Sequence, residues 1–132
     1  MNDSSIGSEV SLYGCSTHRL PFIVTACDST DSFLCLGSET GLLVLSDLRS
    51  GLSVTASDPI HLGEVSGIIS LGGSKFVTYE RMAEELLVTD SLVIIERLKL
   101  PSHILSHRTE IHDLILELHQ QTLTIKLDSL LT

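Results

Sequence analysis

The feature that most constrains this chain is a pattern that recurs about every forty residues. In each copy a histidine comes first, a short apolar run follows, and a later apolar run ends at an aspartate. The histidines are His18, His61 and His107, and the aspartates are Asp47, Asp90 and Asp128. Because two separate markers share nearly one spacing, we interpret the chain as three units that cover residues 18–60, 61–106 and 107–132.

Each unit consists of short apolar runs separated by turns that are rich in Ser, Asp and Gly, which is typical of β-hairpins. Residues 33–51, FLCLGSETGLLVLSDLRSG, contain two such runs on either side of a Ser-Glu-Thr-Gly turn. The stretch LTIKLD at 123–128 alternates apolar and polar residues, which indicates a half-buried strand. The sequence therefore predicts a mainly β domain over residues 9–132, preceded by a flexible leader at residues 1–8.

A second interpretation places helices between residues 81 and 121. Residues 82–86, MAEEL, favour helix, and residues 103–121 can be drawn as an amphipathic helix that begins after Ser102. Periodicity alone does not separate strand from helix in short apolar runs. An α+β fold with helices in 81–121 is therefore the alternative.

The unit resembles the WD40 repeat, in which a histidine precedes four short strands and the third strand ends in Trp-Asp. GLLVLSDLRSG at 41–51 is similar to the end of such a third strand, with Ser46 at the tryptophan position. HLGEVSGIISL at 61–71 is similar to the opening of a repeat. The resemblance implies an incomplete WD40-like β-propeller of about three blades, held by aliphatic packing because the chain has no tryptophan. The recurring histidines and aspartates are interpreted as structural, with each aspartate accepting backbone N–H groups in a turn.

The number of units determines the expected function. Propellers close with roughly four to eight blades, because each blade buries both faces against its neighbours. Three blades, the last without its final strand, would form an open ring with an apolar face at each end. We therefore expect a non-catalytic scaffold or interaction subunit whose faces and strand edges are completed by a protein partner in a larger complex. The residues expected at this interface are Leu12, Tyr13, Ile125, Leu127, Leu130 and Leu131.

Composition limits the kind of partner. Eight basic residues against seventeen acidic ones give a net charge of −9, which disfavours nucleic acid and anionic membranes. No apolar run of about 18 residues occurs, and three cysteines form no dense disulfide framework. We expect an intracellular protein, cytoplasmic or nuclear, whose partners are protein subunits and not nucleic acid, a membrane or a small-molecule substrate.

The residue types that carry catalysis do not form a recognisable pattern. One group of possible zinc ligands is Cys15, His18, Cys27 and Cys35. Their spacing matches no common zinc module, and His103 and His107 would share a face only if their stretch were helical. The Gly- and Ser-containing turns at 63–67 and 72–75 match neither a nucleophile elbow nor a phosphate-binding loop. The sequence predicts no catalytic residue, metal or cofactor; a self-contained α+β adaptor and a metal-dependent enzyme are the alternative functions.

Overall fold

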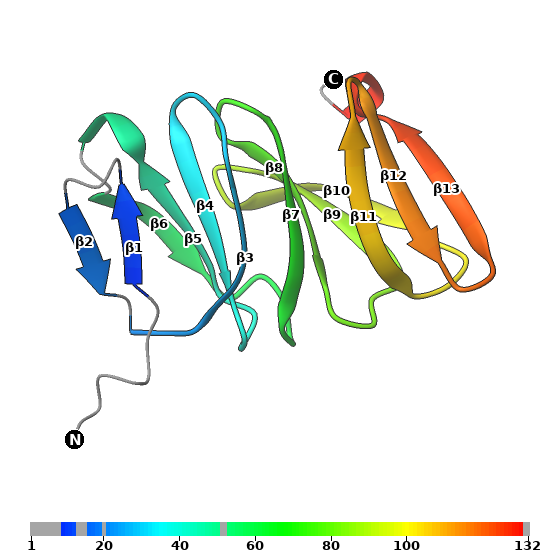
Figure 1. Ribbon diagram of the computed structural model, residues 1–132, viewed down its shortest axis with the longest axis horizontal. Coiled ribbons are helices and arrows are strands. Elements are labelled where there is room, and N and C mark those ends of the chain that lie inside the picture. Colours follow the sequence, from blue (N-terminus) through cyan, green and yellow to red (C-terminus); the bar gives the residue numbers. More distant parts are fainter. Residues whose placement is uncertain (1–8, 13–15, 20, 51–52, 131–132) are drawn as a thin grey trace.

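The computed structural model describes residues 9–12, 16–19, 21–50 and 53–130, and for the first two ranges and Ser53 only the backbone. This part of the chain consists of β-strands and two short 3-10 helices and contains no α-helix. The strands form four separate antiparallel sheets that follow one another along the molecule (Figure 1).

The first sheet is a hairpin of β1 (Glu9–Leu12) and β2 (Ser16–Arg19). We call the three larger sheets blades 1 to 3. Blade 1 contains β3 (Val24–Ser29), β4 (Phe33–Ser38), β5 (Leu43–Asp47) and β6 (Ser53–Asp58). Blade 2 contains β7 (Val65–Gly72), β8 (Lys75–Glu80), β9 (Glu85–Asp90) and β10 (Val93–Lys99). Blade 3 contains β11 (Ile104–Glu110), β12 (Asp113–Leu118) and β13 (Gln121–Lys126). The 3-10 helices are η2 (Leu48–Ser50) and η3 (Leu127–Leu130).

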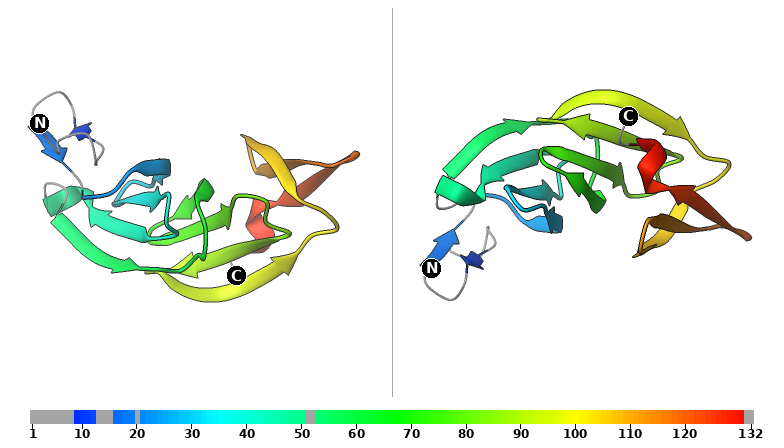
Figure 2. Two further views of the ribbon diagram at one scale, coloured as in Figure 1. Left: turned by 90° about the horizontal axis from the view of Figure 1, so that it is seen from below. Right: turned by 90° about the horizontal axis from the view of Figure 1, so that it is seen from above.

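The blades stand side by side as sectors of a ring that does not close. Within each blade, strands that are consecutive in sequence are neighbours in the sheet. The first strands of blades 1 and 2, β3 and β7, pack against each other, and their last strands, β6 and β10, lie on the opposite side of the molecule (Figure 2). The sheets thus extend outward from a shared inner side.

Two apolar layers hold the blades together. The first layer joins blades 1 and 2 through Cys35, Leu43, Leu45, Val65, Ile68, Phe76 and Leu92. The second layer joins blades 2 and 3 through Ile69, Val77, Tyr79, Leu86, Val88, Ile104, Leu114, Leu116, Leu118 and Leu130. Both layers are mainly aliphatic. Blade 2 is covered on both faces, so β8 directs Phe76 toward blade 1 and the next residue, Val77, toward blade 3.

The outer face of blade 3 is polar, which corrects the expectation of an apolar face there. The leucines of β12 point toward blade 2, so Asp113, Ile115 and Glu117 alternate to the outer face. Arg108 lies 3.2 Å from Glu117, and Lys126 lies 2.9 Å from Asp113. Ile115 lies opposite Arg108 in the β11–β12 ladder and is buried. A polar outer side is what a terminal capping unit of a repeat protein needs.

The far face of blade 1 also differs from the expected apolar surface. Leu36 and Val44 alternate with the side chains of the first layer and therefore point away from blade 2. Only 3% of Val44 is exposed, and Leu36 is similarly buried. The β1–β2 hairpin lies at this end of the molecule (Figure 1). Neither terminal blade therefore presents a broad apolar face among the residues with described side chains.

The alternative with helices in 81–121 does not match the structure, because this region forms strands β9 to β12. Ser91 and Leu92 both have positive φ, 51° and 65°, which is typical of the tight turn that reverses a hairpin. The apolar residues therefore meet partners across the sheet and not along a helix face. Blade 3 begins at Ile104, so the predicted unit boundary at 106/107 falls inside β11.

Candidate interaction surfaces

β13 is an edge strand with one open side. It pairs with β12 along its length, from Gln121 opposite Leu118 to Lys126 opposite Asp113. No second strand of the described part of the chain pairs with it, whereas blades 1 and 2 have β6 and β10 at the corresponding place. Figure 1 shows β13 at the end of the row of sheets. Its outer edge can therefore accept a further strand.

The hairpin geometry determines which backbone groups face this edge. A two-residue turn joins β12 and β13, so the first pair of the ladder is a hydrogen-bonded pair. Bonded and non-bonded pairs then alternate along an antiparallel ladder, which places Leu123 and Ile125 among the residues bonded to β12. The N–H and C=O groups of Thr122, Thr124 and Lys126 consequently point to the open edge.

Three of the residues predicted at the interface lie at the layer between blades 2 and 3. Ile125 and Leu127 are partly buried against the second apolar layer, and Leu130 is a buried member of it. They face blade 2 because β13 turns its threonines and lysine outward, so they stabilise the contact between blades 2 and 3. Leu12 is described by its backbone only, and Tyr13 and Leu131 lie outside the described residues.

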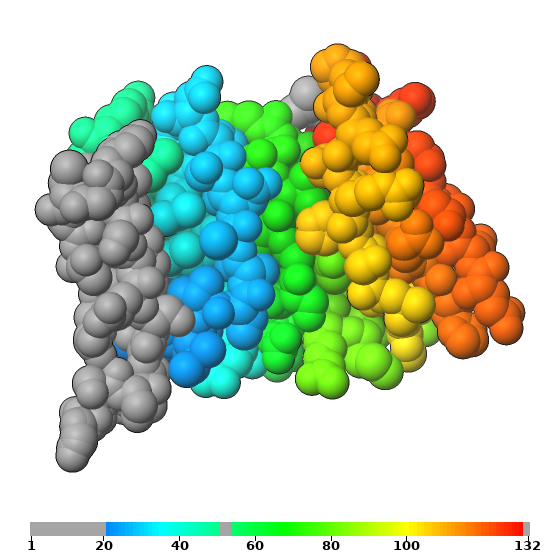
Figure 3. All heavy atoms as spheres, viewed as in Figure 1, coloured from blue at the N-terminus to red at the C-terminus, as the bar shows by residue number. Residues whose placement is uncertain are grey.

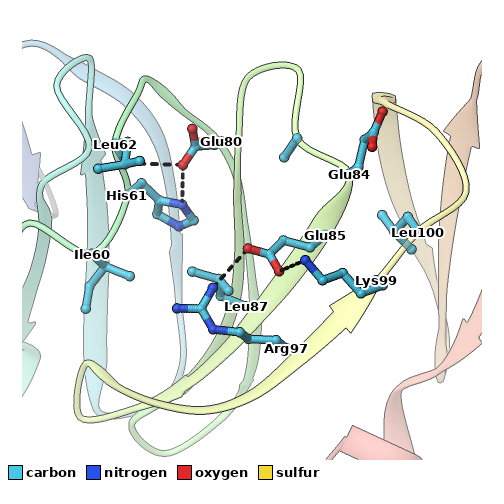
Figure 4. A pocket seen from close by; sticks show the side chains of 11 residues that line it. Ile60, His61, Leu62, Glu80, Glu84, Glu85, Leu87, Arg97, Lys99 and Leu100 are labelled. Carbon is cyan, nitrogen blue, oxygen red and sulfur yellow. Dashed lines mark hydrogen bonds and ion pairs between the residues drawn. The ribbon is translucent and has the colours of Figure 1, made fainter.

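A pocket of about 580 Å³ lies at the rim of blade 2, between the β6–β7 connection and strands β9 and β10 (Figure 4). His61 lies on one side of it, with Nε2 2.8 Å from the Thr78 hydroxyl and Nδ1 3.3 Å from Glu80 Oε1. The same Glu80 oxygen accepts a hydrogen bond from the Leu62 N–H at 3.2 Å. Position 41 must be glycine, because a Cβ there would lie 2.0 Å from the His61 carbonyl oxygen and φ is +94°. These contacts anchor the connection that enters blade 2.

Three charged residues of this pocket pair with one another. Glu85 lies 2.9 Å from Arg97 and 3.3 Å from Lys99. Burial lowers the pKa of His61 and outweighs Glu80, which raises it, so the ring is neutral near pH 7. No group of three or more His, Cys, Asp or Glu side chains in the described part of the chain is arranged to hold a metal ion. The polar contacts at this pocket hold the β6–β7 connection on β8 and link β9 to β10.

The recurring aspartates occupy related positions. Asp47 and Asp90 are the last residues of β5 and β9, the third strands of their blades. The N–H of Arg49 donates to Asp47 at 2.9 Å, and this bond lowers the pKa of Asp47. The Ser74 hydroxyl donates to Asp90 at 2.5 Å. Asp128 lies in η3, just beyond β13, and is exposed.

The recurring histidines do not share one position. His61 precedes β7 and is buried against blade 2. His107 lies inside β11, where its Nδ1 is 2.7 Å from the Tyr79 hydroxyl. His18 belongs to β2, and only its backbone is described.

Polar contacts between β3 and β7 are a feature that the sequence pattern did not indicate. The Ser70 N–H donates to Asp28 at 2.8 Å, and the Thr25 hydroxyl donates to the Val65 carbonyl at 2.6 Å. The structure thus places Asp28 at the contact between two blades. These bonds give hydrogen-bond partners to two backbone groups at the inner edge of β7.

The cysteines do not form a ligand set. Cys35 is fully buried, and burial raises the pKa of its thiol to about 12, so it is protonated and unsuited to binding metal. Cys27 is an exposed free thiol, Cys15 lies outside the described residues, and the imidazole of His18 is not described. Among the described residues, no helix is long and apolar enough to cross a membrane.

Comparison with known proteins identifies the fold. No family model and no curated protein matches this chain. The β-propeller domain of Myceliophteria thermophila Cps50 (Swd1) is similar to it in structure, with a TM-score of 0.60 and 15% sequence identity over 79% of this chain and 34% of that one. The fold is an incomplete, WD40-like β-propeller. Kluyveromyces lactis Hsv2 is also similar, with a TM-score of 0.54 and 13% identity over 79% of this chain and 33% of its own. The chain thus spans about a third of the length of these structures.

Proposed function

We propose that this chain is a non-catalytic, intracellular interaction subunit that binds a protein partner through the open edge of β13. The partner supplies an extended segment that pairs with β13 as the fourth strand of blade 3. The observation that supports this proposal is the free edge of a three-stranded blade beside two four-stranded ones. Addition of a strand to an exposed sheet edge is a common mode of peptide recognition.

The surroundings of the edge specify what the added strand must look like. On the side toward blade 2 it would extend the row of Leu123 and Ile125 and approach Leu98 and Leu100, which are partly buried at the same layer. On the other side it would extend the polar face that includes Lys126. A suitable segment therefore alternates apolar and polar residues. Backbone hydrogen bonds supply affinity, and the apolar positions supply specificity.

A matched pair of variants tests this proposal. In the Thr124→Pro variant the edge N–H is removed, and the β12–β13 ladder keeps its bonds because this N–H points away from β12. Thr124→Ala removes the side chain and keeps the N–H. Tagged wild-type and variant chains are used to capture partners from native extract, with mass spectrometry as the readout and circular dichroism as the control for folding.

We expect a partner that is bound by the wild type and by Thr124→Ala and is lost with Thr124→Pro. A folded Thr124→Pro chain that retains every partner of the wild type would contradict the proposal.

A further inference from the structure

A second surface, independent of the β13 edge, lies between blades 2 and 3. It is a hollow of about 470 Å³ between β7 and β11, with the β8–β9 loop at one end. Figure 3 shows these strands on one face of the molecule, β7 in green and β11 in yellow-orange. The residues that line this hollow and matter here are Ser66, Tyr79, Arg81, Met82, Leu105 and His107. We call it the blade 2–3 groove.

Tyr79 forms the base of the groove and fills the space that a side chain at position 67 would need. A Cβ at Gly67 would lie 2.1 Å from Tyr79 Cε2, so only glycine allows the ring to lie across β7. The ring then reaches blade 3, where its hydroxyl is 2.7 Å from His107 Nδ1. Tyr79 is buried and His107 half-buried. This bond closes the groove from below and links the two blades.

The rim of the groove is apolar and exposed. Met82 is 63% exposed and Leu105 is 66% exposed. The Ile104 N–H donates to the Ala83 carbonyl at 3.1 Å, which holds the loop that carries Met82 beside the start of β11. Met82 also has a φ of 64°, a conformation that is costly for a residue with a side chain. A constrained backbone therefore presents an apolar side chain to solvent.

Polar groups without partners surround the same hollow. Arg81 has no acidic partner among the described residues, whereas Arg49, Arg97 and Arg108 each have one. The Ser66 hydroxyl is also without a partner in that part of the chain. Burial lowers the pKa of His107 and outweighs the opposite effect of Asp28, so the ring is neutral near pH 7. When Tyr79 donates to Nδ1, the His107 proton lies on Nε2, which is then a free donor.

From this arrangement we infer that the blade 2–3 groove binds an extended segment of a protein partner in which an aspartate or glutamate lies beside an apolar residue. The carboxylate pairs with Arg81, whose planar guanidinium suits a bidentate contact. The apolar side chain packs between Met82 and Leu105. Arg81 has no acidic partner in the described part of a chain whose net charge is −9, so the groove is a local site for an acidic ligand. The volume fits one or two side chains and not a folded element.

The test uses random heptapeptides displayed on phage and selected on the full chain. Peptides of the enriched sequence are then synthesised with the acidic residue and with its amide counterpart, and titrated by fluorescence anisotropy. The variants are Arg81→Gln and, as the matched control on the same blade, Arg97→Gln, which changes an arginine that already has a partner in Glu85. A titration at raised salt tests the charge contribution.

We expect the enriched peptides to carry Asp or Glu next to Leu, Ile, Met or Phe. Loss of a charged hydrogen-bond partner should weaken binding about tenfold or more, both for Arg81→Gln and for the amide peptide. Arg97→Gln should bind as the wild type does, and so should Thr124→Pro, which separates this site from the β13 edge. No enrichment, enrichment without an acidic residue, or unchanged affinity of Arg81→Gln would overturn the inference.

Discussion

The contact that Tyr79 makes between blades 2 and 3 depends on the glycine at position 67. The ring fits only because position 67 lacks a side chain, and its hydroxyl then reaches His107 on the next blade. The sequence displays Gly67 as one of several glycines near turns. Nothing in its immediate neighbours indicates that its role is to accommodate an aromatic ring from β8.

Replacing Gly67 with alanine should destabilise the fold by about 2 kcal/mol, because the added methyl group overlaps the Tyr79 ring and a packed core relaxes only partly. Gly63→Ala is the control, since the nearest atom to a Cβ there is Glu80 Oε2 at 3.4 Å, an ordinary contact. Urea unfolding measures the difference. Equal midpoints for the two variants would contradict the packing described for Tyr79.

His61 should make stability depend on pH. Burial lowers its pKa in the folded chain, and the charged groups that act on it are Glu80, Glu85 and Arg97. The unfolded chain takes up the proton near pH 6.5, whereas the folded chain resists it. The contribution of neutral His61 to the free energy of unfolding is therefore complete above about pH 6.5, and it is lost as the pH falls toward the pKa of His61 in the folded chain.

The measurement is the free energy of unfolding from pH 7.5 to pH 5.5 for the wild type and His61→Gln. The glutamine cannot titrate, so the loss of stability on acidification should be smaller in this variant. His107 has its pKa lowered as well and contributes equally in both chains. The same pH dependence in both would exclude His61 as a titrating group.

At the scale of elements, the register of β13 distinguishes residues that look alike in sequence. Leu123 bonds to β12 and packs toward blade 2, whereas Thr124 directs its backbone to the open edge. Alternation in the sequence predicted which side chains share a face. It did not predict which neighbouring sheet covers that face, so the leucines of the last unit looked like an outer surface.

Proline substitution should distinguish positions whose N–H bonds to β12 from positions whose N–H faces the open edge. Thr124→Pro should change stability by less than about 1 kcal/mol, because proline is tolerated where the N–H faces solvent on an edge strand. Leu123→Pro removes a ladder bond and leaves its acceptor on β12 unpaired, so it should cost about 1–3 kcal/mol more than Thr124→Pro. Thermal unfolding is the measurement. A similar loss for both variants would mean that the assigned register is displaced by one residue.

The layer between blades 2 and 3 should depend on individual leucines. Leu114 is fully buried at this layer, so Leu114→Ala should lower the free energy of unfolding by about 2–5 kcal/mol. Leu62→Ala removes a similar side chain that is 98% exposed and should change it by less than about 0.5 kcal/mol. Chemical denaturation compares the two. A small effect of Leu114→Ala would indicate that blade 3 does not pack on blade 2.

At the scale of the whole molecule, much of the fold could be predicted from sequence. Recurrence near forty residues predicted successive four-stranded sheets, and the short last unit predicted a blade without its fourth strand. Two features depend on tertiary contacts and have no local signal. These are the polar cover on blade 3, where Arg108 and Lys126 meet acidic residues of β12, and the bond from Ser70 to Asp28 between blades.

These features change the physical basis of the proposed interaction with a partner. An apolar face at each end would have favoured association, whereas blade 3 presents a polar outer face and an open strand edge. The proposed partner is therefore recognised by backbone pairing along β13. The blade 2–3 groove adds a second contact whose chemistry is different, so the two can be disrupted one at a time.

Residue-resolved amide hydrogen exchange along β13 of the isolated chain tests the open edge most directly. We expect alternation: the amides of Thr122, Thr124 and Lys126 exchange rapidly, and those of Leu123 and Ile125 exchange slowly because they bond to β12. Binding of a partner strand should then protect the first three. Uniform protection of all five amides in the isolated chain would contradict an edge that is open to a further strand.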